Sequence, residues 1–135
     1  MLKALFEQQI PFNKLLGIQL VSAGEGEGVI VIRANPALIG DPSRPALHGG
    51  VLSAMADAAG GLAVFTRLPP GDSVSTVDLR IDYLRPGAVD QDIFARAQVI
   101  RLGNRVAATD CVVYQDSVDA PIAVVRAVYN VVRRG

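Results

Sequence analysis

The sequence predicts an α+β domain in which one long helix is wrapped by a curved antiparallel β-sheet. The first observation is a helix-forming stretch, about residues 50–66, in which Asp57 is the sole charged side chain. The second is a run of four strand-like segments after residue 76, whose short connections favour antiparallel pairing. An antiparallel sheet that must cover an apolar helix has to curl around it.

Length and composition bound the class of protein. The 135 residues suit one domain with a substantial core, so we treat residues 1–135 as a single domain. Half of the residues are apolar and the formal net charge is zero, which disfavours nucleic-acid binding driven by bulk charge. Cys111 is the single cysteine and no Cys/His cluster has metal-ligand spacing, so we expect no disulfide framework, no metal and no cofactor. The N-terminus lacks the apolar core of a signal peptide, which predicts a cytoplasmic protein.

The first part of the chain combines short helices with a hairpin. Apolar side chains recur at helical spacing over residues 2–9, and residues 11–16 form a further helical turn that begins with proline and is closed by Gly17. Two β-branched segments, 18–23 and 28–34, flank a glycine-rich turn and predict a hairpin.

A proline-rich stretch leads into the central helix. Residues 35–47 carry three prolines and predict an irregular loop. The helix that follows runs from about Gly50 to Thr66, and a helix apolar on nearly every side is normally buried. Four glycines in residues 48–66 and a central acid argue against a membrane span. Residues 68–72, Leu-Pro-Pro-Gly-Asp, end the helix.

The rest of the chain is predicted to be all strand. Residues 77–83 alternate apolar and polar side chains, which is typical of a half-buried strand. A tight turn at Gly103-Asn104 separates the next two strands. The predicted strands after the first are residues 91–102, 105–114 and 121–132.

Asp57 needs an explanation, because an unpaired carboxylate is costly to bury. One interpretation is a structural acid that is bonded to backbone amides. The functional interpretation is a base or nucleophile kept in a dry cleft, where desolvation makes a carboxylate more basic.

The pair Gly49-Gly50 lies where the helix begins, and free amides at the positive end of a helix dipole can hold a developing oxyanion. Gly49 and Asp57 are eight residues apart, about 12 Å along a helix, so they cannot both touch one small reacting group. Two copies of the helix packed antiparallel across a two-fold axis would bring them together. We therefore predict an obligate homodimer with two equivalent sites at its interface.

Several motifs resemble one family, the hotdog-fold acyl-CoA thioesterases, and specifically their phenylacetate-pathway, PaaI-like branch. The resemblance spans nearly the whole chain. Its most specific part is the His-Gly-Gly element with an acid nine residues after the histidine, followed by an Asp-Tyr-Leu-Arg-Pro strand. The matching segments are Pro11-Phe12, Leu16-Gly17-Ile18, His48-Gly-Gly with Asp57, and Thr76 to Gly87.

The resemblance implies hydrolysis of coenzyme A thioesters at subunit interfaces without a metal. Asp57 matches the family's acid, which acts as nucleophile or general base. Gly49 matches the residue whose backbone N–H polarises the thioester carbonyl, and Thr76 matches the hydroxyl residue that helps to position the attacking water. Such proteins form dimers that pair into tetramers. We expect the acyl pocket to be shaped by a partner subunit together with Leu52, Met55, Leu62 and Phe65.

The sequence departs from the family at one place. Many relatives carry an Asn or Gln several residues before the histidine, but residues 39–47 contain no amide side chain. Either Asp41 or Ser43 takes that place, or the contact is absent.

The other candidate binding residues each have two interpretations. His48, beside Gly50, either orients the loop by bonding to backbone or is the base of a hotdog dehydratase or hydratase, although the His-Phe-Pro-Gly pattern of the acyl-carrier dehydratases is missing. Arg105, which flanks the turn at Gly103, either contacts coenzyme A phosphates or is a solvated surface arginine. A non-catalytic protein that binds acyl-CoA is the remaining alternative.

Overall fold

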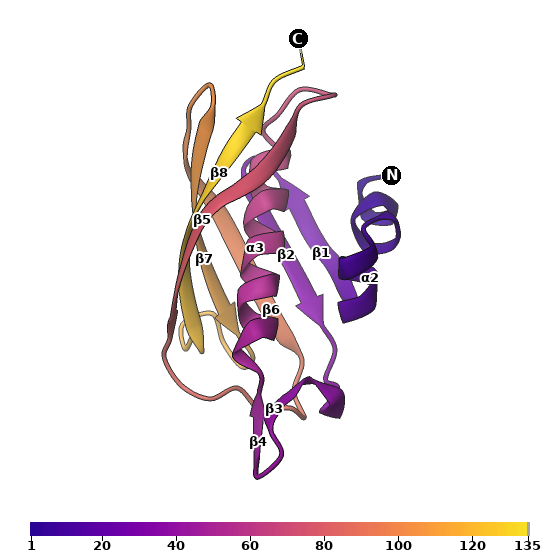
Figure 1. The fold of residues 1–135 in the computed structure, drawn as a ribbon, viewed down its shortest axis with the longest axis vertical. Coiled ribbons are helices and arrows are strands. Elements are labelled where there is room, and N and C mark those ends of the chain that lie inside the picture. The colour runs from indigo at the N-terminus through magenta and orange to yellow at the C-terminus, as the bar shows by residue number, and fades with distance from the viewer. Residues whose placement is uncertain (135) are drawn as a thin grey trace.

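The computed structural model describes residues 1–134, and these residues form the predicted α+β fold. A six-stranded antiparallel sheet with the order β1-β2-β6-β7-β8-β5 packs against the long helix α3 (Gly49–Phe65). α3 lies along one face of this sheet, and the N-terminal helices lie beside β1 (Figure 1). The sheet therefore covers one side of the helix.

The strands follow the predicted order along the chain. β1 (Ile18–Gly24) and β2 (Glu27–Ile32) form the expected hairpin, and Glu25 and Gly26 of its turn both have positive φ. The strands after the helix are β5 (Ser73–Tyr83), β6 (Ile93–Leu102), β7 (Val106–Tyr114) and β8 (Ala123–Val132).

The first of these later strands does not pair with the next one along the chain. β5 pairs with β8 at the edge of the sheet, whereas β6 pairs with β2. The expectation of pairing between consecutive strands is therefore wrong at this step. The connecting segment 84–92 is longer than a hairpin turn and lies next to the residues just before α3, where Gly87 O accepts a hydrogen bond from Leu47 N at 3.0 Å.

β5 is an edge strand, and it is more exposed than the sequence predicts. The half-buried alternation expected for residues 77–83 holds at Leu79 and Ile81, but the side chain of Val77 is 64% exposed. A bulge between Thr76 and Asp78 interrupts the alternation, and no strand formed by residues 1–134 pairs with the outer edge of β5.

The N-terminal segment consists of α1 (Leu2–Ala4), a π-helical turn η1 (Leu5–Gln9) and α2 (Pro11–Leu16), which confirms the short helices predicted there. A buried carboxylate attaches this segment to the sheet. Glu7 accepts hydrogen bonds from Lys3 Nζ and from the backbone N–H of Leu20, both at 2.6 Å. These two donors hold the pKa of Glu7 below its usual range.

The proline-rich stretch before α3 is more regular than the predicted irregular loop. It contains a 3₁₀ turn η2 (Pro36–Leu38) and a small hairpin of β3 (Ile39–Asp41) and β4 (Arg44–Leu47). The hairpin forms because Asp41 Oδ1 accepts hydrogen bonds from both the N–H and the hydroxyl of Ser43, at 2.9 and 2.7 Å. The two residues considered as substitutes for the missing amide side chain are thus bonded to each other.

α3 begins and ends within one residue of its predicted bounds. Its sheet-facing side is closely packed, and Met55, Ala59 and Ala63 are completely buried. Its opposite side, which includes Ala54 and Ala58, is partly exposed. The expectation of a helix buried on every side is therefore wrong for a single chain.

Within residues 1–134 no helix is long and apolar enough to cross a membrane.

Candidate active site

Asp57 lies in the middle of α3, on its partly exposed side and next to β5. Its Oδ1 accepts a hydrogen bond from Thr76 Oγ1 at 2.6 Å, so the structure brings together the acid and the hydroxyl that the resemblance pairs. The carboxylate is partly exposed. The dry cleft expected around it is consequently not completed by one chain.

A second hydroxyl holds the backbone of the same residue. Tyr129 on β8 is 1% exposed, and its hydroxyl donates to Asp57 O at 2.8 Å. Thr76 and Tyr129 are direct partners in the β5–β8 register, so one cross-strand pair holds both the side chain and the carbonyl of Asp57. Burial, together with the negative charge of Asp57, raises the pKa of Tyr129, which keeps its hydroxyl protonated as a donor.

Gly60 makes room for the Tyr129 hydroxyl. A Cβ at Gly60 would lie 2.2 Å from Tyr129 Oη and 3.0 Å from Thr109 Oγ1. A Cβ at the neighbouring Gly61 would meet nothing closer than 3.7 Å. The contact between Tyr129 and the Asp57 carbonyl therefore requires glycine at position 60 and not at position 61.

The start of α3 presents a free amide. His48 caps the helix, because its Nδ1 accepts a hydrogen bond from Gly50 N at 2.8 Å, which is the orienting role considered for it. Tyr83 at the end of β5 donates its hydroxyl to Gly49 O at 3.1 Å. The peptide group between the two glycines is thus held at both its carbonyl and its N–H. The N–H of Gly49 itself has no hydrogen-bond acceptor among residues 1–134.

The free amide and the acid are separated along the helix. Eight residues of one α-helix place Gly49 and Asp57 about 12 Å apart. One chain therefore supplies both chemical groups without bringing them to one reacting atom. The dimeric arrangement that would do so stays a prediction.

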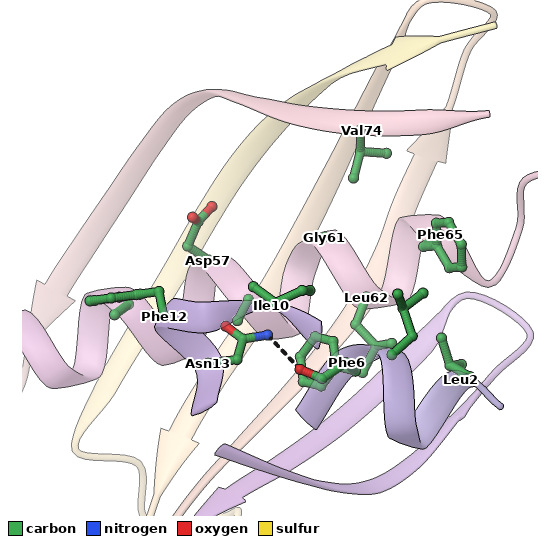
Figure 2. Close-up of a pocket in the computed structure, with 13 residues that line it drawn as sticks. Leu2, Phe6, Ile10, Phe12, Asn13, Asp57, Gly61, Leu62, Phe65 and Val74 are labelled. Carbon is green, nitrogen blue, oxygen red and sulfur yellow. Dashed lines mark hydrogen bonds between the residues drawn. The ribbon is translucent and has the colours of Figure 1, made fainter. Parts of the chain in front are cut away.

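An apolar cavity of about 290 Å³ opens beside Asp57. Its floor is α3, and its walls are Val74 of β5 and the N-terminal segment. Figure 2 shows Asp57 toward one end of the helical residues that line it and Phe65 at the other. Leu62 and Phe65 line the cavity as expected for an acyl pocket, whereas Met55 is buried in the core.

The structure does not place the predicted coenzyme A contacts next to the free amide. The turn that carries Gly103 and the exposed Arg105 lies beside the end of β8, where Val131 N donates to Arg105 O at 2.7 Å. Gly49 lies toward the opposite end of the sheet, next to Tyr83 at the end of β5. In one chain these groups are on different ends of the molecule.

Among residues 1–134, no group of three or more His, Cys, Asp or Glu side chains is arranged to hold a metal ion.

Comparison with known proteins identifies the family. A family model described as the thioesterase superfamily matches residues 45–121, which is more than half of the chain. The chain belongs to this superfamily. It is a thioester hydrolase, and the matched segment includes the start of α3, Asp57 and Thr76.

Individual relatives agree with the family model. The medium/long-chain acyl-CoA thioesterase YigI of Escherichia coli strain K12 is 32% identical over 116 residues, covering 76% of this chain and 74% of that protein. A putative esterase of Halobacterium salinarum is 35% identical over 126 residues, covering 87% and 82%. The structure of the E. coli PaaI protein from the phenylacetic acid degradation operon matches with a TM-score of 0.83 at 26% identity, covering 98% of this chain and 89% of that one. These likenesses confirm a PaaI-like hotdog thioesterase.

Two kinds of site residue in this thioesterase were not predicted from the sequence. Tyr83 and Tyr129 hold the backbone of α3 at Gly49 and Asp57, and the N-terminal segment lines the cavity. An alternating strand pattern marks a tyrosine as inward-facing but does not reveal which helical carbonyl it reaches. The amphipathic pattern of residues 2–9 likewise predicts a packed helix without showing what its apolar side faces.

Proposed function

We propose that this thioesterase hydrolyses acyl-CoA at two equivalent sites, each shared between two copies of the chain. Asp57 of one copy and the Gly49 amide of the other act on the same thioester. The observation that carries the proposal is the Asp57 carboxylate itself, held at one oxygen by Thr76 and lying at an apolar cavity. The names of the relatives support coenzyme A thioesters as the substrate class.

The reaction needs a group that activates water and a donor for the oxyanion. Asp57 acts either as a base that takes a proton from water, or as a nucleophile that forms an anhydride which water then hydrolyses. In both cases the carbonyl oxygen becomes negative, and the Gly49 N–H together with the helix dipole stabilises it. The C–S bond then breaks as the carbonyl re-forms, and the sulfur leaves as the thiol with the proton that Asp57 took from water or, in the nucleophile route, with a proton from solvent water. The Thr76 hydrogen bond to Oδ1 keeps the other carboxylate oxygen directed at the substrate.

Two exposed surfaces favour a second copy as the partner. β5 is an 11-residue strand, and within the described part of the chain no strand pairs with its outer edge. The side of α3 that the sheet leaves uncovered is apolar apart from Asp57 and Ser53. Antiparallel packing of two such helices also brings the end that carries Arg105 and Gly103 of one copy toward His48 and Gly50 of the other. We therefore retain these four residues as substrate contacts.

Removing one N–H tests the oxyanion donor. Gly49 is the first residue of α3, where proline is tolerated, and His48 already has the extended conformation (φ −66°, ψ 129°) that a following proline requires. We expect Gly49→Pro to lower kcat by about 10² to 10³, as for loss of one oxyanion donor. Gly49→Ala is the matched control, because its Cβ makes the same close approach to the Tyr83 ring but keeps the N–H.

Replacing the acid tests the base or nucleophile. We expect Asp57→Asn and Asp57→Ala to lower hydrolysis of an acyl-CoA panel by two or more orders of magnitude while the folded dimer is kept. Rates equal to those of the native protein would refute the assignment of Asp57. Water addition to an enoyl-CoA by the native protein would instead support the hydratase alternative.

Mixing the two inactive variants tests whether the site is shared. If each site uses Asp57 of one copy and Gly49 of the other, a heterodimer of Asp57→Asn and Gly49→Pro chains contains one intact site. Random mixing during refolding would restore about a quarter of the native activity per chain. An inactive mixture that contains heterodimers would show that sites are not shared.

A further inference from the structure

We propose that the cavity beside Asp57 holds the straight aliphatic chain of the substrate's acyl group, about eight to ten carbons long, and that the N-terminal segment is its outer wall. This inference rests on the proposed function, because it assigns the acyl group that the same site cleaves.

The cavity is continuous with the candidate catalytic carboxylate. Asp57 is one of its lining residues, and from there α3 contributes a row of small or apolar side chains toward the C-terminal end of the helix. Among the described residues that line the cavity, Asp57 is also the one charged side chain. A thioester at Asp57 would therefore direct its apolar tail along the helix and away from solvent. The residues of this row are Ala58, Gly61, Leu62 and Phe65.

The length of the cavity sets the length of the chain. Asp57 and Phe65 are eight residues apart, about 12 Å along the helix. An extended chain advances about 1.2 Å per bond, as an extended polypeptide does, so about ten bonds span this distance. A volume of about 290 Å³ lies at the lower end of the range for ligand pockets, which fits an acyl tail and not the whole coenzyme.

The rim of the cavity is apolar although it faces solvent. Large exposed apolar side chains that cluster on a soluble protein mark a binding surface. Four such residues surround the cavity, three on the N-terminal segment and one at the end of α3. They are Leu5, Ile10, Phe12 and Phe65, which are 38%, 39%, 56% and 37% exposed.

The N-terminal wall is fixed independently of the helix it faces. Glu7 attaches it to β1 through the backbone N–H of Leu20, and Asn13 Nδ2 donates to Phe6 O at 3.1 Å within the wall itself (Figure 2). Neither bond involves α3. An aliphatic chain can therefore lie between the wall and α3 without breaking a polar contact of either one.

The test is the dependence of kcat/KM on acyl length, from butyryl-CoA to tetradecanoyl-CoA. For the native dimer we expect kcat/KM to rise about fourfold per added methylene and to level off near ten carbons, since each buried methylene contributes a similar increment. Phenylacetyl-CoA should be a poorer substrate than decanoyl-CoA. A preference for the aryl substrate, or no dependence on length, would overturn the proposal.

A block in the middle of the cavity should shorten the preferred chain. Gly61 is about 6 Å beyond Asp57, so a side chain there leaves room for about five bonds. We expect Gly61→Leu to lower the decanoyl to butyryl ratio of kcat/KM by about three orders of magnitude, because about five methylenes lose their place in the cavity. Gly61→Ala, whose Cβ makes only ordinary contacts at 3.7 and 3.8 Å, should lower the same ratio severalfold in a chain that folds normally.

Two leucines of the N-terminal segment provide a matched pair for the wall. Leu5 lines the cavity, whereas Leu15 is 79% exposed and outside its lining. Leu5→Ala should lower the decanoyl to butyryl ratio severalfold, and Leu15→Ala should leave it unchanged.

The outcomes separate this inference from the function on which it rests. If the native protein cleaves no acyl-CoA, the proposed function fails. If it cleaves them and the Gly61 and Leu5 variants leave the length profile intact, the cavity is not the acyl site. If Gly61→Leu changes the oligomeric state in sedimentation without changing the profile, a second copy of the chain occupies the cavity, and the proposal is wrong.

Discussion

The hydroxyl of Tyr129 offers the sharpest test of how the fold positions Asp57. Tyr129→Phe keeps the buried ring and removes the hydroxyl that donates to Asp57 O at 2.8 Å and also hydrogen-bonds with the buried side chain of Thr109. The carbonyl still has its partner within α3, but the buried Thr109 hydroxyl loses its Tyr129 partner, so the free energy of unfolding should fall by about 1–3 kcal/mol. The Asp57 backbone is then held less firmly against β8. A displacement of 1 Å costs about 10² in rate, so a smaller one should lower kcat by about tenfold.

The assay compares kcat and KM for decanoyl-CoA in Tyr129→Phe and Tyr114→Phe. Tyr114 is the matched control because its ring stacks on Phe94, with centroids 5.5 Å apart, on the outer side of the sheet. We expect kcat to fall with KM nearly constant in the first variant, and neither to change in the second. Loss of stability without loss of kcat, or a loss confined to KM, would refute a positioning role for Tyr129.

Three further predictions follow from the same geometry. Gly60→Ala should lower the free energy of unfolding by about 1–3 kcal/mol, because its Cβ would overlap Tyr129 Oη. Gly61→Ala should raise it by up to about 1 kcal/mol, since its Cβ makes only ordinary contacts. Denaturant unfolding measures both changes, and equal effects would contradict the structure. The pKa of Glu7 is lower in the folded protein than its ordinary value of 4.5, so the Glu7 carboxylate stabilises the fold above pH 4.5, and this stability is lost as the pH falls through the folded-state pKa. In Glu7→Gln the melting temperature should therefore fall less steeply with decreasing pH in the acid range. Burial raises the pKa of Cys111 to about 12, so a thiol reagent at pH 8 should label it only in denaturant, and rapid labelling of the native protein would be inconsistent with this burial.

Local patterns in the sequence predicted most of the elements correctly. The proline and glycine at the two ends of residues 11–17 delimit a helix, and Gly17 adopts the left-handed conformation that ends it. The β-branched segments on either side of Gly24 to Gly28 form the hairpin. The alternation in residues 77–83 located β5 but not its exposure, because a bulge and an unpaired edge depend on neighbours that the strand's own residues do not specify.

The chemistry of the site was partly visible along the chain. A lone acid in an apolar helix and two glycines at the start of that helix are local features, and they sufficed to select Asp57 and Gly49. Thr76 was predicted only from the family resemblance. In the structure its hydroxyl donates a hydrogen bond to the Asp57 carboxylate, 19 positions away in the chain.

The sequence by itself determined the candidate catalytic groups of this thioesterase, because residue type and helical spacing place an acid and a free amide about 12 Å apart on one rigid element. Only the tertiary structure decided what surrounds them. Tyr129, 72 positions from Asp57, reaches its carbonyl because β8 lies next to β5 and not elsewhere in the sheet. The N-terminal segment becomes the wall of a cavity because Glu7 bonds to β1, 13 positions further along the chain. Such contacts join residues that are distant in sequence, and their geometry follows from strand order and packing, which local propensity does not encode.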